Sequence, residues 1–269
     1  MSSKIHPSAV IDAKAELGVD VVIGPNCVVD EGSVIGDGTI LDANVTVGKD
    51  VVIGKGNCFY ANSVIGRAPQ LLGLKPDGEY GKLIIGDNNT IREMVTIHPS
   101  MYPDKTTEIG NRNLLMIGMH IGHDCVFEDD IIMSNYTQLS GHCKVESGVW
   151  FAGVVLVHQF VTIGKWSYAA GLSGINHDVA PFIMISGHYP PEVRSINKRG
   201  LDRAGYDAQQ QKNILKAFKR IYKSDEGVFT DRVEALAAEE DLDENVRYMV
   251  DSIKRSNEHR FGRHLELYR

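Results

Sequence analysis

An aliphatic residue returns at every sixth position over most of this chain, and that period constrains the fold more than any other feature. One uninterrupted run covers residues 5–65, and a second run in a shifted phase covers residues 85–175. A hexapeptide period is typical of a parallel β-helix, in which three short strands make one triangular coil and stacked coils share a core. We therefore expect an all-β solenoid with three hexapeptides in each coil. The repeat positions are Ile5, Ile11, Leu17, Ile23, Val29, Ile35, Leu41, Val47, Ile53, Phe59 and Ile65, then Ile85, Ile91, Ile97, Ile109, Leu115, Ile121, Phe127, Met133, Leu139, Val145, Phe151, Val157, Ile163, Ala169 and Ile175.

Two excursions interrupt the repeat. The first excursion is residues 67–84, and it makes the spacing from Ile65 to Ile85 two residues longer than one coil. The second excursion is residues 98–108, and it leaves the six-residue phase unchanged. Long loops on a regular scaffold often carry function, although flexible surface decoration is the alternative. We expect residues 1–196 to form one solenoid domain with these two loops.

The hexapeptide repeat fades after Ile175, and from about Leu201 the pattern of apolar residues becomes helical. Apolar residues then recur at intervals of three and four, so residues 197–269 are predicted to form a small α-helical C-terminal domain. Thr230 and Asp243 are candidate N-caps for its middle and last helices. The final stretch, residues 257–269, is polar enough that we expect it to fray. The helical apolar positions are Ile214, Phe218, Ile221, Tyr222, Val246, Met249, Val250 and Ile253.

Charge and hydropathy argue against nucleic-acid binding, secretion and a membrane-spanning segment. The formal net charge of -7 gives no support for nucleic-acid binding. The start, MSSKIHPSAV, lacks the basic flank and apolar run of a signal peptide, and no stretch of 18 apolar residues could cross a membrane. We expect a cytoplasmic protein with no integral membrane segment.

Four cysteines do not make a disulfide framework in a chain of this length. Cys125 and Cys143 are one coil apart, and, like Cys27, they follow a repeat aliphatic by four positions, where small residues stand elsewhere. We expect small, buried core thiols, with metal or redox chemistry as the alternative. A buried thiol is inert, so this position also disfavours Cys125 as a nucleophile.

Histidines cluster in the second run. Five of the ten lie between residues 98 and 158, and the coil period of three hexapeptides should stack several of them along one edge of the solenoid. Successive coils lie ~4.8 Å apart, so members of one column should touch. Scattered surface histidines are the alternative. The five are His98, His120, His123, His142 and His158, and the columns are His123 with Gly141 and Gln159, Asp124 with His142, and Ser140 with His158.

This cluster suggests a general base beside an oxyanion donor. A neutral His123 could take a proton from a hydroxyl or amine near pH 7, and Asp124 could orient its ring. The unshielded N–H of Gly141 could stabilise the oxyanion of an acyl-transfer intermediate. A zinc site is disfavoured, because His120 and His123 are three positions apart, unlike the close ligand pair of solenoid carbonic anhydrases. We therefore predict no metal.

The classical nucleotide-binding loops are absent, since the chain contains neither GxxxxGK[ST] nor a GxGxxG after a strand. Any nucleotide must therefore be held by the solenoid surface and its loops. Candidate residues come from the basic segment RSINKRGLDR, although a solvated face is the alternative. They are Arg194, Lys198, Arg199 and Arg203.

At this level of detail the chain resembles the UDP-N-acetylglucosamine O-acyltransferases of lipid A biosynthesis over nearly its whole length. The distinctive strings are NLLMIGMHIGHDC (113–125), LSGHCKV (139–145), VHQFVTIG (157–164) and INKRGLDRAGY (196–206). The resemblance implies a homotrimer of left-handed parallel β-helices with active sites between subunits, an exception to the right-handed crossover rule. It implies transfer of a 3-hydroxyacyl group from the phosphopantetheine of acyl carrier protein to the glucosamine 3-position of UDP-N-acetylglucosamine, with no further cofactor.

The resemblance also implies roles for individual residues. His123 matches the general base, Asp124 its partner and Gly141 the oxyanion donor. Asn197 and Arg203 match residues that reach the uridine nucleotide from the next subunit. Gly171 falls where acyl length is set, and the lack of a side chain leaves the groove open for a longer chain. The groups that line the donor and acceptor are His120, His142, His158 and Gln159.

The first excursion departs from the family pattern. The family usually has an Asp soon after a Gln in this loop, followed closely by a Lys, and both acidic and basic groups contact the sugar. Gln70 and Lys75 are candidates here, but the Asp is missing unless Asp77 replaces it. Ala204 stands where some members carry a second Arg. Three functions stay open: transfer to UDP-N-acetylglucosamine, transfer to a variant such as the 3-amino sugar, and ligand binding without catalysis.

Docking of acyl carrier protein must overcome repulsion between two negatively charged proteins. Acyl carrier proteins are acidic and this chain is net negative, so docking requires a local basic patch. We expect the patch to consist of Arg194, Lys198 and Arg199, with Lys165 as a further candidate.

Overall fold

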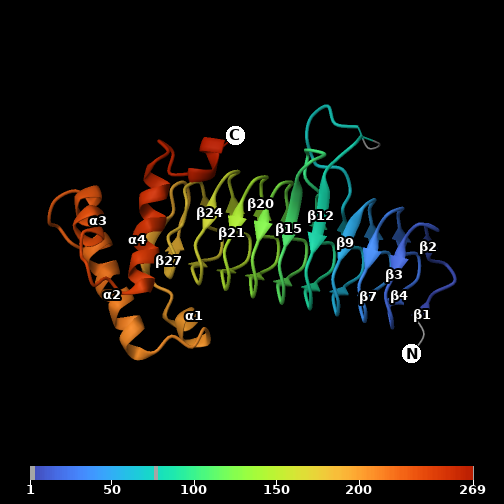
Figure 1. The fold of residues 1–269 in the computed structure, drawn as a ribbon, viewed down its shortest axis with the longest axis horizontal. Coiled ribbons are helices and arrows are strands. Elements are labelled where there is room, and N and C mark those ends of the chain that lie inside the picture. The colour runs from blue at the N-terminus through green and yellow to red at the C-terminus, as the bar shows by residue number, and fades with distance from the viewer. Residues whose placement is uncertain (1–3, 76–77, 269) are drawn as a thin grey trace.

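The protein is a long stack of coils with a helical cluster at its C-terminal end (Figure 1). This computed structural model describes residues 4–75 and 78–268. The expected left-handed all-β solenoid followed by helices is confirmed. None of the described helices combines the length and apolar character that a membrane span requires.

The strands form three flat sheets, which we call A, B and C, and each coil contributes one strand to each sheet. Sheet A contains β1 (Lys4–Ile5), β4 (Val22–Ile23), β7 (Ile40–Leu41), β10 (Cys58–Phe59), β13 (Thr90–Ile91), β16 (Leu114–Leu115), β19 (Ile132–Met133), β22 (Trp150–Phe151), β25 (Tyr168–Ala169), β27 (Ile183–Ser186) and β28 (Glu192–Ile196). Sheet B contains β2 (Val10–Ile11), β5 (Val28–Val29), β8 (Thr46–Val47), β11 (Val64–Ile65), β14 (Thr96–Ile97), β17 (His120–Ile121), β20 (Gln138–Leu139), β23 (Leu156–Val157) and β26 (Gly174–Ile175). Sheet C contains β3 (Glu16–Leu17), β6 (Val34–Ile35), β9 (Val51–Ile53), β12 (Lys82–Ile85), β15 (Thr106–Ile109), β18 (Val126–Phe127), β21 (Lys144–Val145) and β24 (Thr162–Ile163).

Pairing in these sheets is parallel, except where β28 returns antiparallel to β27. Columns of turns run along the corners of the stack. The B–C edge is the column of turns from sheet B to sheet C, including residues 122–125, 140–143 and 158–161. The A–B edge is the column of turns from sheet A to sheet B, including residues 134–137, 152–155 and 170–173.

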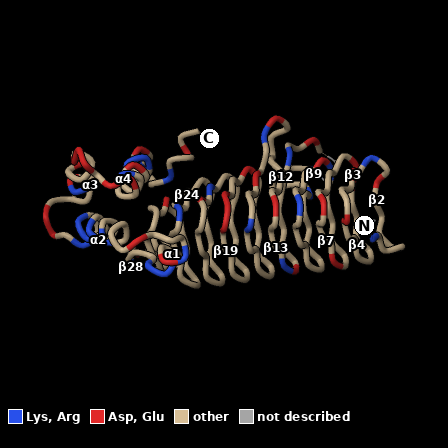
Figure 2. The backbone as a smooth tube through the Cα atoms, turned by 60° about the horizontal axis from the view of Figure 1, so that its bottom comes forward, with Lys and Arg blue, Asp and Glu red and all other residues tan. Residues whose placement is uncertain are grey.

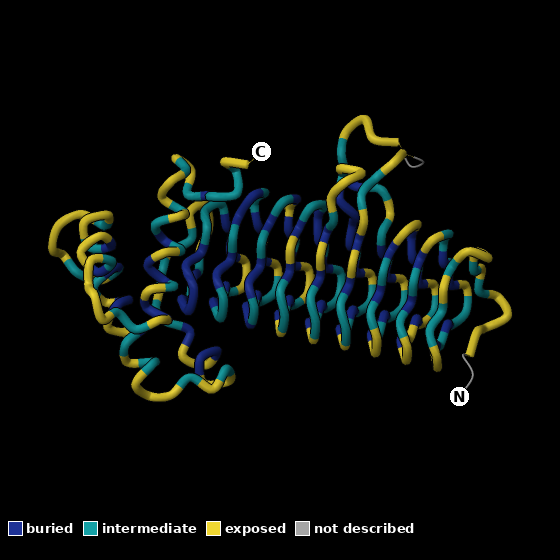
Figure 3. Tube along the Cα trace, in the orientation of Figure 1, coloured by how far each residue is buried: buried dark blue, intermediate teal, exposed yellow. Residues whose placement is uncertain are grey.

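The repeat aliphatics fill the interior of the stack, as the dark core of Figure 3 shows. Ile23 and Ile163 are each 1% exposed, whereas Ile5 in the first coil is 46% exposed because no coil lies beneath it. Cys27, Cys125 and Cys143 are buried free thiols, as predicted from their repeat position. Burial raises the pKa of the Cys143 thiol, and a contact with Cys125 adds to that effect.

A ladder of buried asparagines keeps neighbouring coils in register. The Oδ1 atom of Asn57 accepts the N–H of Asn89 at 2.9 Å, and Asn89 accepts the N–H of Asn113 at 2.9 Å. Asn113 in turn accepts the N–H of Ile131 at 2.8 Å. Each side chain therefore satisfies a turn N–H that would otherwise be buried without a partner.

Both excursions leave the solenoid at the B–C edge and are shorter than expected. The first occupies residues 66–81 instead of 67–84, and the second occupies residues 98–105 instead of 98–108. The predicted ends are wrong because the two loops pair with each other as they return: Lys82 aligns with Thr106, and the strands they begin are four residues long.

The helical domain contains α1 (Lys198–Arg203), α2 (Ala208–Tyr222), α3 (Phe229–Ala237), α4 (Glu244–Asn257) and a final 3₁₀ helix, η1 (His264–Tyr268). Asp243 is confirmed as the N-cap of α4, since its side chain accepts the N–H groups of Asn245 and Val246. The Thr230 cap is wrong. Helix α3 starts at Phe229 after Val228, because Arg232 binds the carbonyl of Gly227 and fixes the chain before the helix.

Residues 262–266 of the final stretch do not fray, which corrects our expectation. The N–H of Asp178 donates to the Gly262 carbonyl at 2.6 Å, and Arg263 donates to the Asn176 carbonyl at 2.9 Å. Arg263 also pairs with Glu266 and is only 8% exposed. These contacts dock the C-terminal segment on the B–C edge of the solenoid.

Candidate functional site

The B–C edge brings the predicted base and oxyanion donor together. His123 lies in the turn between β17 and β18, and Gly141 lies in the turn one coil further on. The imidazole packs on the glycine so closely that a Cβ on Gly141 would lie 2.6 Å from Cε1 and 2.7 Å from Nε2 of His123. Only glycine can therefore occupy position 141 without moving the ring.

The neighbouring carboxylate orients the His123 ring. Nδ1 of His123 lies 2.7 Å from Oδ2 of Asp124, and both side chains are largely buried, at 13% and 6% exposed. Nε2 of His142 lies 3.9 Å from the same oxygen. His142 itself stacks on Phe160, with ring centroids 4.6 Å apart and planes inclined by 9°. Asp124 and His142 thus form a compact polar cluster that packs against the ring of Phe160.

Asp124 is held in its ionised form. Burial acts to raise the pKa of Asp124, but hydrogen bonds from His123, Ser100 and the Met101 N–H outweigh it and hold the pKa below its usual range. An ionised carboxylate can only accept hydrogen bonds, so Nδ1 of His123 carries the proton. Nε2 is consequently the free basic nitrogen, and it faces Gly141.

Two further histidines beside this pair are neutral at physiological pH. Burial lowers the pKa of His120 to about 4, helped by repulsion from His98 and His123, and burial lowers the pKa of His98 as well. Nδ1 of His98 donates to the Arg67 carbonyl at 2.8 Å, and the two rings lie 5.2 Å apart. Within residues 4–75 and 78–268, Nε2 of His98 is buried with no hydrogen-bond partner.

The backbone N–H of Gly141 has no acceptor among the described residues, whereas the Gly141 carbonyl accepts the N–H of Phe160 at 3.2 Å. A donor without a partner and without a shielding side chain is suited to an oxyanion.

The other predicted site residues are spread along the solenoid. Gln70 and Lys75 are exposed on the first excursion, and Asp77 lies outside the described residues. Nδ1 of His158 is 3.0 Å from the carbonyl of Gln159, next along the B–C edge. Gly171 lies on the A–B edge, where a Cβ would meet the Gly153 carbonyl oxygen at 3.3 Å and the Ala152 Cβ at 3.9 Å.

The two predicted nucleotide ligands are not brought to His123 within this chain. Asn197 is 4% exposed; it caps α1 by accepting the Gly200 N–H at 3.1 Å and donates to the Trp166 carbonyl at 2.8 Å. The guanidinium of Arg203 lies over the Trp150 ring at 4.6 Å, on the outer side of sheet A. Both residues belong to the helical end of the molecule (Figure 1).

Several neighbours of the site were not predicted from the sequence. The Ser100 hydroxyl donates to Oδ1 of Asp124, and the Tyr102 ring lies 6.2 Å from the His142 ring. The Phe160 ring stacks on that of His142. Ser100 and Tyr102 lie on the second excursion, where the hexapeptide period no longer aligns positions, so spacing offered no signal for them.

The same cluster supplies the metal-donor group found in the part of the chain that the structure describes. One donor atom each from His123, Asp124 and His142 lies within 4.8 Å of the others. The shortest of these contacts is the 2.7 Å hydrogen bond of His123 to Asp124. Because this hydrogen bond already joins His123 to Asp124, the arrangement fits proton transfer better than metal binding.

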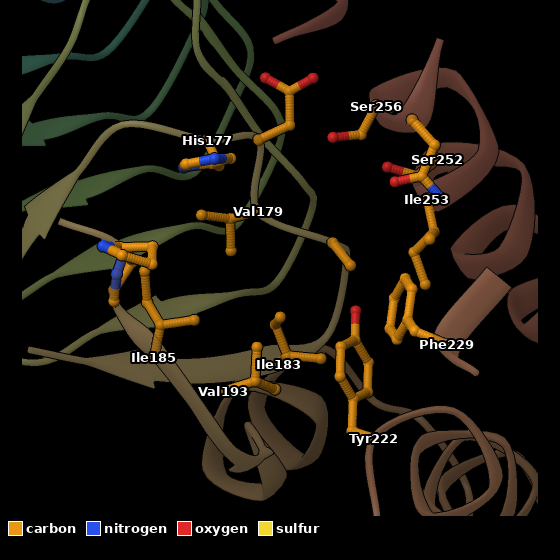
Figure 4. Close-up of a pocket in the computed structure, with 15 residues that line it drawn as sticks. His177, Val179, Ile183, Ile185, Val193, Tyr222, Phe229, Ser252, Ile253 and Ser256 are labelled. Atoms are coloured by element: carbon orange, nitrogen blue, oxygen red, sulfur yellow. The ribbon is translucent and has the colours of Figure 1, made fainter. Parts of the chain in front are cut away.

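A cavity of about 200 Å³ lies elsewhere, between the last coils and the helices (Figure 4). Val179, Ile183 and Ile185 line its solenoid side, and Tyr222 and Phe229 line its helical side. Burial raises the pKa of Asp178 at its rim to about 6. The cavity lies several coils beyond His123 and contains none of the predicted site residues.

Comparison with known proteins points to one family. Residues 178–262 match the family described as UDP-N-acetylglucosamine O-acyltransferase, domain 2, and residues 32–67 match the six-repeat bacterial transferase hexapeptide family. The acyl-[acyl-carrier-protein]--UDP-N-acetylglucosamine O-acyltransferase of Halorhodospira halophila is 40% identical over 94% of this chain and 97% of that protein.

Two further relatives differ in how much of them is matched. The O-acyltransferase of the same description from Gloeothece citriformis is 43% identical over 59% of this chain. That match spans about half of the relative's length, 56%. The solved UDP-N-acetylglucosamine acyltransferase from Campylobacter jejuni has a TM-score of 0.86 at 32% identity, covering 93% of this chain and 96% of that one.

Proposed function

Because the chain belongs to the family of acyl-[acyl-carrier-protein]--UDP-N-acetylglucosamine O-acyltransferases, we propose that it catalyses the first step of lipid A biosynthesis. In this reaction a 3-hydroxyacyl group passes from acyl carrier protein to the glucosamine 3-position of UDP-N-acetylglucosamine. The observation that carries the proposal is the His123 ring, which is oriented by Asp124 on one side and packed on Gly141 on the other.

The geometry supports a general-base mechanism. Nε2 of His123 accepts the proton of the sugar 3-hydroxyl as its oxygen attacks the thioester carbonyl. The Gly141 N–H donates to the resulting oxyanion, a contact typically worth about 10²–10³-fold in rate. When the intermediate collapses, the C–S bond breaks and the protonated His123 returns the proton to the phosphopantetheine thiolate. Asp124 stabilises the transient imidazolium.

This mechanism uses no metal and no cofactor beyond the carrier protein's own phosphopantetheine. Proton transfer and oxyanion binding are both supplied by groups of the chain. The neutral His120 and His98 add no positive charge that would lower the proton affinity of His123.

We propose a homotrimer with active sites between subunits. A column of exposed apolar side chains follows the A–B edge, where successive coils place Tyr136, Val154 and Leu172 at 52%, 42% and 73% exposed. Contiguous exposed apolar side chains usually mark an interface, and three equivalent flanks can close on each other. The family resemblance implies that Arg203 of one subunit would then reach the site of the next.

The basic residues near α1 are the proposed docking surface for the acidic carrier protein, whose reaction we place in the cytoplasm. Arg194, Lys198 and Arg199 cluster on β28 and α1, where Figure 2 shows basic residues beside α2 as well. Lys165 stays a further candidate for this surface, and its ammonium lies 3.8 Å from the centre of the Tyr248 ring.

Turnover tests the proposal directly. The purified chain, treated with EDTA, is mixed with 3-hydroxyacyl carrier protein and UDP-N-acetylglucosamine, and the acylated sugar and free carrier thiol are measured. We expect equal amounts of both products. Binding of the UDP-sugar without any turnover would instead favour the non-catalytic alternative.

A further inference from the structure

Ser100 lies where the two excursions meet, directly beside the catalytic carboxylate. Its side chain is completely buried, and its hydroxyl donates to Oδ1 of Asp124. The Tyr102 N–H donates to the same hydroxyl at 3.0 Å. The hydroxyl has one proton, and the charged carboxylate is the strongest acceptor in reach, so the direction of this hydrogen bond is set.

The backbone around Ser100 is tied to the first excursion. The Gly81 N–H donates to the Ser100 carbonyl at 2.9 Å, and the Ser100 N–H donates to the Lys82 carbonyl at 3.2 Å. A Cβ on Gly81 would lie 2.1 Å from the Tyr102 carbonyl oxygen and 2.8 Å from Cβ of Ser100. The end of the loop that carries Gln70 and Lys75 is therefore pressed against the residue that binds Asp124.

Asp124 consequently has its two oxygens held by different parts of the chain. Oδ1 accepts from Ser100, while Oδ2 accepts from Nδ1 of His123 at 2.7 Å and from the Met101 N–H at 3.3 Å. Without the Ser100 hydroxyl, Oδ1 would be an unsatisfied charged atom in a side chain that is 6% exposed. Such an atom would turn towards another donor and pull Oδ2 away from His123.

We propose that Ser100 is a positioning residue for the reaction: it holds the Asp124 carboxylate, and through it keeps His123 in the tautomer with the proton on Nδ1. This inference rests on the proposed function of His123 as the base. It also couples the two excursions to that base, because the loop contacts of Ser100 and its contact with Asp124 come from one residue.

The test compares Ser100→Ala with Ser100→Thr, which keeps the hydroxyl. We expect Ser100→Ala to lower kcat roughly tenfold, as loss of a hydrogen bond to a charged group implies. The KM for each substrate should change less than about twofold, since the Ser100 side chain is completely buried and is not exposed to a bound substrate. Ser100→Thr should recover most of the rate. Ser63→Ala is the matched control, because Ser63 is also fully buried but its hydroxyl has no partner among the described residues.

A spectroscopic readout separates this inference from the proposed function. Histidine ¹⁵N chemical shifts should report a proton on Nδ1 of His123 in the unmodified chain and a mixture of tautomers in Ser100→Ala. The tautomer measurement tests the role of Ser100 even if the chain shows no acyl transfer. An absence of acyl transfer would contradict the proposed function but not the role of Ser100. Unchanged kcat and an unchanged tautomer in Ser100→Ala would overturn the inference.

If Ser100→Ala does not fold, the pair Ser100→Thr and Ser100→Val decides instead, since the two side chains have nearly the same shape and differ in the hydroxyl. A slow Val variant with mixed His123 tautomers beside an active Thr variant supports the role of Ser100. Equal rates and equal tautomers in the two variants overturn it.

Discussion

The imidazole of His123 rests on the α-carbon of Gly141, one coil away, at a separation that leaves no room for a Cβ. The proposed general base and the proposed oxyanion donor are therefore in direct contact, so a change in either displaces the other. This contact exists because the two positions are three hexapeptides apart, which is one full coil of the stack.

We expect Gly141→Ala to abolish most activity while the protein stays folded. The added methyl would meet Cε1 of His123 at 2.6 Å, so the ring must leave its place between Asp124 and the acceptor. A loss of about 10²-fold or more in kcat is expected, since a misplaced base loses its share of catalysis. Gly153→Ala is the control, because its methyl would meet nothing closer than 3.6 Å. Equal loss in both variants would contradict this explanation.

His123→Ala should lower kcat by about 10²–10⁴-fold, the usual share of a positioned acid–base group. The comparison is His6→Ala, which removes an exposed histidine whose ring bonds Ser8 on the first coil. Acyl transfer is measured at saturating UDP-sugar in both variants. Full activity in His123→Ala would exclude it as the base.

The buried histidine His120 should make stability depend on pH. Burial lowers the folded-state pKa of His120 to about 4, so between pH 4 and 6.5 the unfolded chain binds more protons and unfolding becomes easier as pH falls. Asp178 acts with the opposite sign, because burial raises its pKa to about 6 and its contribution is lost as pH rises through that value.

The contribution of His120 to this pH dependence is the difference in free energy of unfolding between the unmodified chain and the variant His120→Gln. The free energy of unfolding of the unmodified chain, relative to that variant, should rise by up to about 3 kcal/mol between pH 4 and 6.5. Denaturant unfolding at several pH values measures it. A difference that stays constant across this window would show that His120 titrates normally in the folded protein.

Leu172→Glu should dissociate the proposed trimer. Leu172 is 73% exposed in the single chain and belongs to the apolar column of the A–B edge, so an interface there would bury the new charge without a partner. Sedimentation should report monomers for Leu172→Glu and trimers for Val19→Glu, whose parent residue is 62% exposed on the first coils. Trimers in both variants would place the interface elsewhere.

Acceptor identity can be decided by comparing kcat/KM for UDP-N-acetylglucosamine and its 3-amino analogue with one acyl donor. We expect the hydroxyl acceptor to be preferred, because the base and the oxyanion donor suit a hydroxyl nucleophile. The first excursion lacks the family's Asp; unless Asp77 or a water replaces it, the 3-hydroxyl has one fewer charged partner, worth about 1.5–3 kcal/mol. A tenfold or greater preference for the amino sugar would reverse the assignment.

The hexapeptide period was enough to predict the solenoid and the centre of the site. In a two-residue strand one side chain faces the core, so an aliphatic residue every six positions determines both the strands and their stacking. The same period predicts His123 over Gly141 and Asp124 beside His142, and both contacts are present. The Asp243 cap was predictable too, because capping depends on residues that are neighbours in sequence.

Only the tertiary structure determined the contacts of the segments that lie outside the hexapeptide repeat. Ser100 contacts Asp124, 24 positions later in the sequence, because the second excursion folds back on the first. The length of such a loop does not indicate which of its residues align with those of the coils. The tail was expected to fray from its polarity, yet Arg263 docks on Asn176, 87 positions earlier. Local sequence determines strands, turns and caps through short-range sterics, whereas contacts between irregular segments depend on which surfaces the finished coils bring together.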